Sequence, residues 1–256
     1  MRDMGRSPWG RPNPYTTLWK RAMPRRRRPF PTEKRTGGVR RGSRKGDLDM
    51  SRCVVIGGAE IARYDRVRSY LREDDFCICC DSGLRHRAGL GIVPALVVGD
   101  FDSHPNPHLD TETLVLPREK DDTDTAFAVK EALGRGFQEF LLVGVFGGRL
   151  DHTLGNLSLL LFLDARGRRA LALDDYAEME IVSDRPALIP DRYPYFSLLN
   201  ISGTARDITI RNAKFPLTGG EIPCEYQYGI SNEVLPGKTA EVSVGEGRLL
   251  LVKVLD

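Results

Sequence analysis

Short, almost wholly apolar segments alternate with segments of helical periodicity after Met50, and this alternation constrains the fold more than any other feature. The apolar segments lack the polar alternate positions that mark a strand with one solvent-facing side. Strands buried on both sides and separated by helices predict a parallel sheet covered on both faces. The expected strands are 53–58, 76–83, 95–103, 111–117, 140–148, 169–175 and 177–183, and the expected helices are 59–73, 122–136 and 151–167.

The pattern changes after about Ser183, where prolines introduce short alternating segments with no helical pattern between them. This pattern of short alternating segments favours antiparallel β-structure, either a small sandwich or a half-barrel. We therefore predict an α/β fold, with an N-terminal parallel-sheet (Rossmann-like) domain over residues 50–183 and an antiparallel β-sandwich type of domain over 184–256. The expected strands of the second domain are 195–202, 207–213, 239–247 and 248–255.

Residues 1–49 differ from the rest of the chain in charge. They hold 15 Lys/Arg against 4 Asp/Glu, a net charge of +11, whereas residues 50–256 hold 23 against 31, a net charge of −8. Because 1–49 are rich in Arg, Pro and Gly and show no strand or helix period, we predict a disordered N-terminal extension. It could be a solvated leader, an upstream stretch joined to a domain that starts at Met50, or a transit peptide. The run Arg25–Arg28 could bind nucleic acid, but the acidic body argues against a broad nucleic-acid surface, so we do not expect nucleic acid as a partner.

The cysteines favour a reducing compartment. There are five, an odd number, and three lie in the expected strand at 76–80. Neighbouring strand residues such as Cys79 and Cys80 point to opposite faces and are poorly placed to share a metal ion. We expect small buried apolar side chains and a cytoplasmic location. No run approaches the ~18 apolar residues of a membrane span, so no membrane partner is expected.

Glycine and aspartate residues follow the expected strands at the points where the strands end. In an open parallel sheet all carboxyl ends lie along one edge, and ligands bind in the crevice outside that edge. The sequence therefore predicts that glycines and carboxylates from distant parts of the chain meet there. The glycine-containing ends are Gly57-Gly58, Asp81–Gly83, Gly99–Ser103 and Gly147–His152, and the acidic residues at the rim are Asp100, Asp102, Asp121, Asp122, Asp124 and Asp151.

Such a rim suits a magnesium ion and a phosphorylated substrate. Gathered carboxylates repel one another unless a cation joins them or some are protonated. Mg²⁺ takes oxygen ligands and commonly binds one or two protein carboxylates together with substrate phosphates. Backbone N–H groups of glycines, helix N-termini and the cations of Lys120 and Arg149 suit phosphate oxygens. These residues predict Mg²⁺-dependent phosphoryl-type transfer, although each motif alone also fits a turn or a helix cap.

Four motifs in this order resemble those of the bacterial thiamine pyrophosphokinase family: Gly99–Ser103, Lys120–Thr125, Gly147–His152 and Gly229–Glu233. The resemblance runs from about Met50 to the end of the chain. It implies an α/β domain followed by a β-sandwich, and a homodimer with thiamine bound between subunits. The implied reaction is the Mg²⁺-dependent transfer of the pyrophosphoryl group of ATP to the thiamine hydroxyl, with release of AMP.

The resemblance also implies roles for individual residues. The implied metal ligands, which are also catalytic, are Asp100, Asp102 and Asp124. The implied ATP-binding residues are Asp81, Lys120, Asp121, Thr123 and Arg149. Asp151 is implied to be catalytic at the junction of ATP and thiamine, and Ser231 and Asn232 are implied to contact thiamine.

Two features depart from the family pattern. The second-strand motif, commonly Ala-Asp-Gly-Gly, reads Cys80-Asp81-Ser82-Gly83 here, and residues 1–49 lie outside the pattern. The aromatic residue that would stack on thiamine is open between Tyr226 and Tyr228.

Two other functions compete with this one. A Mg²⁺-dependent phosphohydrolase would use Asp100 and Asp102 as nucleophile and acid/base, but it would need a downstream lysine that we do not find before the acidic pair at 174–175. A nucleic-acid-binding protein would act through residues 1–49 and would lose its function without them.

Overall fold

The computed structural model describes residues 52–101, 109–119, 121–201 and 203–256. The strands are β1 (Cys53–Ile56), β2 (Phe76–Cys80), β3 (Leu96–Gly99), β4 (Glu112–Val115), β5 (Glu139–Val143), β6 (Arg169–Leu173), β7 (Ala177–Val182), β8 (Ala187–Pro190), β9 (Phe196–Asn200), β10 (Thr204–Arg211), β11 (Leu217–Pro223), β12 (Thr239–Ser243) and β13 (Leu249–Val254). The helices are α2 (Tyr64–Arg68), the 3₁₀ helix η1 (Asp81–His86), α3 (Arg87–Leu90), α4 (Asp124–Arg135) and α5 (Leu150–Asp164). The predicted extension 1–49 lies outside the described residues.

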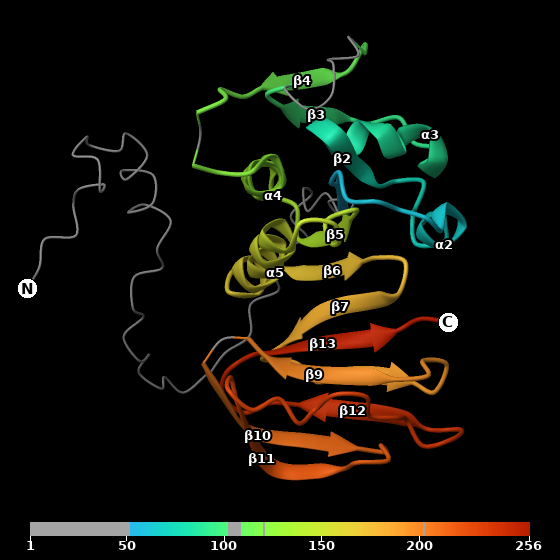
Figure 1. Cartoon of the computed structure of the whole chain (residues 1–256), viewed down its shortest axis with the longest axis vertical. Coiled ribbons are helices and arrows are strands. Elements are labelled where there is room, and N and C mark those ends of the chain that lie inside the picture. Colours follow the sequence, from blue (N-terminus) through green and yellow to red (C-terminus); the bar gives the residue numbers. More distant parts are fainter. Residues whose placement is uncertain (1–51, 102–108, 120, 202) are drawn as a thin grey trace, which may run out of the picture. The chain divides into compact units, whose positions relative to one another are not determined.

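Nine of the described strands form one sheet in the order β4-β3-β2-β1-β5-β6-β7-β13-β9 (Figure 1). From β4 to β6 every pair of neighbours is parallel. The strand β7, by contrast, pairs antiparallel with β6, and β13 pairs antiparallel with both β7 and β9. The predicted α/β class with a parallel sheet is confirmed, and the structure adds an antiparallel end to that sheet.

Helices cover both faces of the parallel part, which explains its continuous apolar strands. In β1, Cys53 and Val55 belong to the core cluster that includes α4 and α5. The alternate residues Val54 and Ile56 belong to the opposite cluster, which includes Val67 of α2. Both sides of the strand are therefore buried, and no polar position is needed.

A second sheet, in the order β11-β10-β12-β8, packs against the antiparallel end of the first. Their shared core joins Phe196 and Leu251 of the large sheet to Ile210 and Val242 of the small one. This two-layer arrangement is a β-sandwich, as the resemblance implied. The predicted domain boundary at residue 183 falls between β7 and β8 and stays a prediction, because the large sheet continues across it through β13 and β9.

The expectation for the cysteines agrees with the structure at four positions. Cys53, Cys77, Cys79 and Cys80 are buried free thiols, while Cys224 is exposed. Cys79 and Cys80 belong to core clusters on opposite faces of the sheet, as the strand geometry predicts. Burial raises the pKa of the Cys77 thiol to about 11 and that of Cys79 to about 12.

Several elements differ from the expectation, and among them η1 and α3 were not predicted. The helix predicted over 59–73 is limited to α2, because the Asp175 carboxylate accepts the backbone N–H groups of Ala62 and Arg63 and holds the preceding segment in a loop. The strands β8 and β11 were not predicted. Both are edge strands of the small sheet, where Pro190 and the glycines of β11 are tolerated because one side needs no ladder hydrogen bonds.

The longest helix in the described part of the chain, α5, has 15 residues. No helix there is both long enough and apolar enough to cross a membrane.

Candidate active site

The sheet reverses its strand order at β1, so that β1 and β5 form a switch point at the carboxyl edge of the sheet. From β1 the chain proceeds through β2 and β3 to β4 on one side, and then returns to place β5 on the other. Such a switch point is where open α/β sheets bind ligands. Here Gly57 donates its N–H to Val143 O at 2.8 Å, and a Cβ on Gly57 would lie 2.5 Å from Gly144 O. The two strand ends therefore approach as closely as glycine permits.

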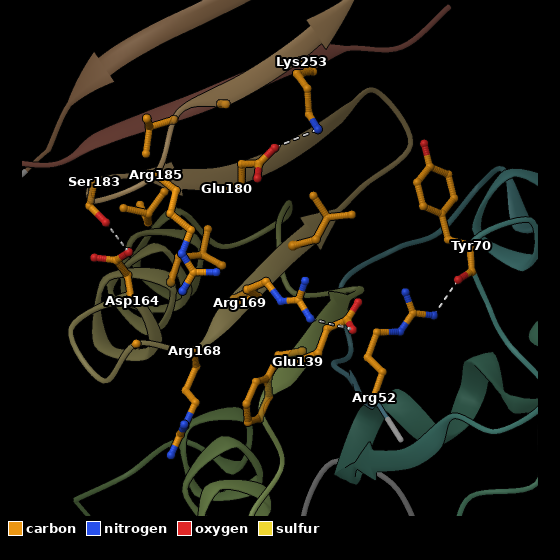
Figure 2. Close-up of a pocket in the computed structure, with 18 of the residues that line it drawn as sticks. Arg52, Tyr70, Glu139, Asp164, Arg168, Arg169, Glu180, Ser183, Arg185 and Lys253 are labelled. Atoms are coloured by element: carbon orange, nitrogen blue, oxygen red, sulfur yellow. Dashed lines mark hydrogen bonds and ion pairs between the residues drawn. The ribbon is translucent and has the colours of Figure 1, made fainter. Parts of the chain in front are cut away.

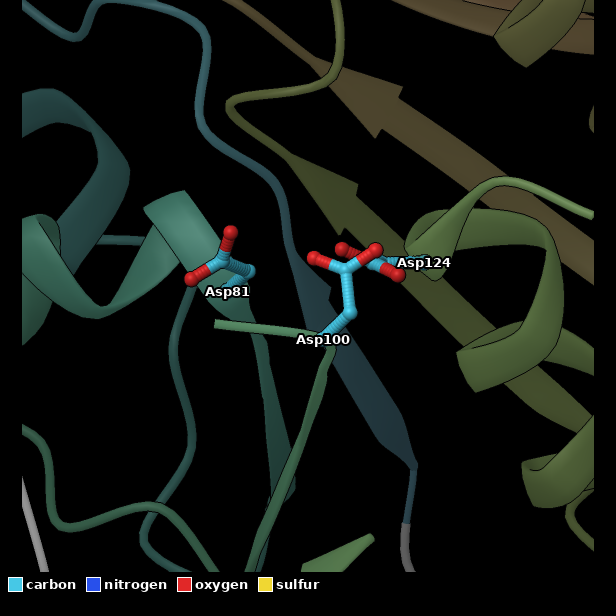
Figure 3. A group of neighbouring side chains, drawn as sticks. All are labelled: Asp81, Asp100 and Asp124. Atoms are coloured by element: carbon cyan, nitrogen blue, oxygen red, sulfur yellow. The ribbon is translucent and has the colours of Figure 1, made fainter. Parts of the chain in front are cut away.

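Three aspartates meet at this edge. Asp81 follows β2, Asp100 follows β3, and Asp124 begins α4 (Figure 3). One carboxylate oxygen from each lies within 4.8 Å of those of the other two. The convergence that the strand-end pattern predicts is present for these three residues.

Local backbone geometry fixes the first two aspartates. Gly99 packs against Asp81 so closely that a Cβ at residue 99 would lie 2.7 Å from the Asp81 Cβ. Phe101 has a φ of 57°, in the left-handed region that non-glycine residues rarely adopt, and the chain turns there directly after Asp100. Ser82, the departure from the family pattern, is not among the described residues with positive φ, so its side chain causes no such strain.

Asp124 is held by the start of α4. The Thr123 hydroxyl caps this helix by accepting the Ala126 N–H at 3.2 Å, and Asp124 is the first helical residue. A carboxylate at a helix N-terminus lies near the positive end of the helix dipole. The predicted role of Thr123 in ATP binding stays a prediction, and the structure gives it a capping role as well.

The donor set fits a hard divalent cation. All three side chains offer carboxylate oxygens, and one oxygen in each of Asp81 and Asp124 is shielded from solvent. Oxygens bound to one Mg²⁺ at ~2.1 Å lie up to ~4.2 Å apart, so a closure of under ~1 Å would bring this set to an ion. Asp81 was expected on the ATP side, and its position here makes it a candidate metal ligand.

Two of the predicted site residues, Asp102 and Lys120, lie outside the described residues. The two residues that follow Lys120, Asp121 and Asp122, lie in different surroundings. Asp121 is exposed beside α4, whereas Asp122 forms an ion pair with Lys130 at 2.6 Å. This ion pair directs the Asp122 carboxylate along α4, away from the start of the helix.

Arg149 and Asp151 form an exposed ion pair at the start of α5. Arg149 Nη2 lies 2.5 Å from an Asp151 oxygen, and the hydrogen bond from Arg149 lowers the pKa of Asp151 to about 2. Gly147 donates its N–H to the Thr153 hydroxyl at 3.1 Å, which ties the glycine turn to the helix. Both charges are therefore available at the same edge as the aspartates.

The two residues expected to contact thiamine are placed differently. Asn232 is buried, and its side-chain amide pairs with the backbone of Phe215, accepting at 3.0 Å and donating at 2.8 Å. Ser231, its neighbour, is exposed and has a φ of 58°. Asn232 thus holds the loop in place, and Ser231 offers the accessible hydroxyl. Near them in sequence, the exposed rings of Tyr226 and Tyr228 lie 5.6 Å apart.

Two residues at this edge were not found by sequence reasoning. Arg85 of η1 donates to the carbonyls of Gly58 and Ser82, which places a cation beside the glycine turn after β1. His86 is buried, donates from Nε2 to Ala59 O at 2.8 Å, and accepts the Tyr64 hydroxyl at Nδ1 at 2.8 Å. Nothing in the sequence distinguishes these side chains from others on a polar helix, because their role depends on contact with the distant Gly57–Ala59 segment.

Two family models match the chain. The thiamin pyrophosphokinase catalytic domain matches residues 67–171, and the thiamin pyrophosphokinase vitamin B1 binding domain matches residues 181–249. Together they cover more than half of the chain and nearly the whole region in which the sequence motifs lie.

Known relatives agree with these matches. A thiamine pyrophosphokinase of Bacillus subtilis is 26% identical, over 79% of this chain and 98% of its own. The crystal structure of a thiamin pyrophosphokinase from Geobacillus thermodenitrificans has a TM-score of 0.70 and 28% identity, and covers 80% of this chain and 98% of its own. Yeast thiamin pyrophosphokinase shares the fold, with a TM-score of 0.65 at 14% identity, covering 82% of this chain and 88% of its own.

The resemblance predicted from the four motifs is therefore confirmed, and neither the phosphohydrolase nor the nucleic-acid-binding alternative gains support. The chain belongs to the thiamine pyrophosphokinase family, a family of enzymes.

Proposed function

We propose that the edge formed by Asp81, Asp100 and Asp124 is where this chain transfers the pyrophosphoryl group of ATP to the thiamine hydroxyl. The observation that carries this proposal is the convergence of three carboxylates from separate strand ends, within 4.8 Å, in a chain that matches both domains of the family. In the reaction, the hydroxyl oxygen bonds to the β-phosphorus of ATP. The bond from that phosphorus to the oxygen on the α-phosphate breaks, AMP leaves with that oxygen, and the hydroxyl proton passes to solvent.

The three aspartates would hold Mg²⁺, with Asp102 as the further ligand that the motif predicts. When bound, the ion neutralises charge on the phosphate oxygens and orients them. The support for the ion is the all-oxygen donor set and its spacing. Asp81 joins the metal ligands in this proposal because it lies in the cluster.

The nucleotide phosphates would lie against the carboxyl ends of β1 and β5. Gly57 and Gly58 allow the backbone there to approach an anion closely, and Arg85 and Arg149 lie at the same edge as possible partners of phosphate oxygens. We retain Lys120, Asp121 and Thr123 as predicted ATP-binding residues.

Asp151 would orient thiamine rather than accept its proton. The guanidinium of Arg149 lowers the pKa of Asp151 to about 2, which leaves a carboxylate too weakly basic for efficient general-base catalysis at neutral pH. As an ionised group beside an arginine, it suits a fixed electrostatic contact with a cationic substrate such as thiamine.

Thiamine itself would contact the sandwich, and a homodimer would bring it to the aspartates. The support is a set of exposed apolar side chains in both regions: Leu150 and Leu154 on α5, and Tyr226, Tyr228 and Ile230 in the loop that ends at Ser231. Apolar side chains exposed in this way often mark an interface. We also retain the prediction of a cytoplasmic location, since the described cysteines are free thiols.

A direct assay tests the function. The full chain is incubated with ATP, thiamine and Mg²⁺, and the products are identified by mass. The proposal requires AMP and thiamine diphosphate in equal amounts, with no product when thiamine or Mg²⁺ is left out. Release of inorganic phosphate without thiamine diphosphate would contradict it.

A further inference from the structure

A cavity lies at the opposite edge of the parallel sheet from the aspartate cluster. Its volume is about 600 Å³, and its lining includes Arg52, Glu139 and Arg169, which stand immediately before β1 or begin β5 and β6. The five steps along the chain from Arg52 to Gly57 span about 16 Å in a strand, at ~3.3 Å per residue. The cavity is thus separated from the aspartates by the full length of the strands.

The mouth of this cavity carries more positive than negative charge. Among the described residues, the Glu139 carboxylate pairs with two guanidinium groups, Arg72 at 3.1 Å and Arg169 at 3.8 Å. Arg168 donates to the uncharged Gln138, and its Nε is buried with no hydrogen-bond partner in the described part of the chain. One carboxylate therefore serves two arginines, and a third arginine has a neutral partner.

Arg185 adds a fourth guanidinium from another part of the fold. It follows β7, and its nearest carboxylate is that of the adjacent Asp184, at 3.8 Å. Arg169 and Arg185 both line the cavity and come from different segments of the chain, and Figure 2 shows the Arg169 side chain directed toward Glu139. Their side chains are 70% and 63% exposed, so a ligand can reach both. Guanidinium groups arranged in this way suit phosphate oxygens.

The charged groups in the inner part of the cavity form ion pairs, and its walls are partly apolar. Arg52 pairs with Asp75 at 2.7 Å and Asp164 pairs with Arg248 at 2.6 Å, whereas Lys253 is shared between Glu178 at 2.6 Å and Glu180 at 2.8 Å. Leu71, Leu171 and Ile181 are among the apolar lining residues. The Glu180 carboxylate, also in the lining, would attract an amino group and repel a phosphate. The cavity therefore has a basic mouth, apolar walls and an acidic group inside.

We propose that this cavity is a second ligand site, separate from the aspartate cluster, for a small organic phosphate that carries an amino-substituted heterocycle. The phosphate lies between Arg169 and Arg185, and the ring enters between the apolar walls toward Glu180. The volume is in the ordinary range for such ligands, ~300–1,000 Å³. AMP and thiamine diphosphate both have this chemistry, and the binding test separates them.

The test compares two double variants of the full-length chain by calorimetric titration. Arg169→Gln with Arg185→Gln removes the two guanidinium groups at the mouth. Arg206→Gln with Arg211→Gln is the matched control, because these arginines are 56% and 65% exposed, form ion pairs and lie on β10, away from the cavity. AMP, thiamine diphosphate and inorganic phosphate are titrated separately.

We expect the wild type and the control to bind one equivalent more of AMP or thiamine diphosphate per chain than the cavity variant. If the cavity variant still binds this additional equivalent, its Kd for that equivalent should be at least about tenfold higher than the wild-type value, because two charge-assisted hydrogen-bonding groups are lost. The proposal is overturned if the cavity variant and the control bind alike. Equal affinity of the wild type for inorganic phosphate and for both organic probes would show that the heterocycle is not recognised and would contradict the proposed class of ligand. Product formation from ATP and thiamine is assayed on the same samples, so that failure of the second site is distinguished from failure of the proposed function.

Discussion

At the carboxyl edge of the parallel sheet, β2 and β3 lead into Asp81 and Asp100 and the neighbouring turns contain closely packed glycines. At the amino edge of the same sheet, β5 and β6 begin with Glu139 and Arg169, and arginines gather around a cavity. The strands between the two edges are apolar and buried on both faces. The comparison shows that one scaffold separates an edge of clustered aspartates and close-packed glycines from a second edge dominated by ion pairs. Removing charges at the two edges should therefore have different consequences.

The largest expected effect is on turnover at the carboxyl edge. Asp100→Ala or Asp124→Ala should lower kcat by roughly 10²–10³-fold or more, because the site loses a ligand for the ion that neutralises the phosphates. The thermal unfolding midpoint should change little, since these partly exposed carboxylates add little to the apolar core. Asp184→Ala at the amino edge, where the side chain is 76% exposed, is the matched control and should leave kcat unchanged. Equal losses of kcat in all three variants would show that the two edges do not differ in their contribution to turnover.

At the amino edge, removing a charge should lower stability and leave turnover nearly unchanged. Arg52 and Asp75 form a buried ion pair at the amino edge, with side chains only 7% and 2% exposed. Arg52→Met should lower the free energy of unfolding by about 3–5 kcal/mol, because Asp75 is left charged in a buried position. Chemical denaturation measures this loss. The kcat per folded molecule should stay near the wild-type value, and a large loss of kcat with unchanged stability would contradict the assignment of this pair to structure.

Close backbone approach gives a smaller effect. Gly57→Ala should lower stability by about 1–3 kcal/mol and reduce turnover, since its Cβ would lie 2.5 Å from Gly144 O at the switch point. Gly134→Ala is the control, because a Cβ there meets nothing within 4 Å and the residue lies inside α4. This control should raise stability by up to ~1 kcal/mol. Denaturation curves and steady-state kinetics of both variants provide the measurement.

The sequence predicted the parts of this architecture that depend on local pattern. The alternation of apolar strands and helices is a property of short windows, and it correctly predicted the α/β class. The positions of Asp100 and Asp124 at the carboxyl edge followed from topology alone, because every parallel strand ends there. These inferences needed no knowledge of which strands are neighbours.

The parts that could not be predicted depend on distant contacts. The strand-end pattern placed Asp81 at the carboxyl edge, but its position as a candidate metal ligand depends on β2 lying beside β3 and on Gly99 allowing the two strand ends to approach, and neither fact is visible in the residues around Asp81. The return of β13 to pair with β7 extends the large sheet across the predicted domain boundary. The basic cavity likewise combines segments as far apart in sequence as Arg52 and Arg185.

The smallest expected effect concerns pH at the carboxyl edge. Burial is the main cause that lowers the pKa of His86 below 6.5, and the nearby Arg85 acts in the same direction while Asp175 opposes it. The unfolded chain then binds more protons than the folded one as the pH falls through about 6.5, so stability should decline below that pH. Protonation of Nδ1 would also remove the acceptor for the Tyr64 hydroxyl, a hydrogen bond that contributes about 0.5–1.5 kcal/mol. We expect the unfolding midpoint to fall by roughly 2–4 °C between pH 7 and pH 5.5, on the scale of ~1 kcal/mol for a chain of this size.

Tyr64→Phe should lower the midpoint at pH 7 and weaken this dependence, because the hydrogen bond is already absent. A variant that keeps the full pH dependence would show that another group titrates in this range.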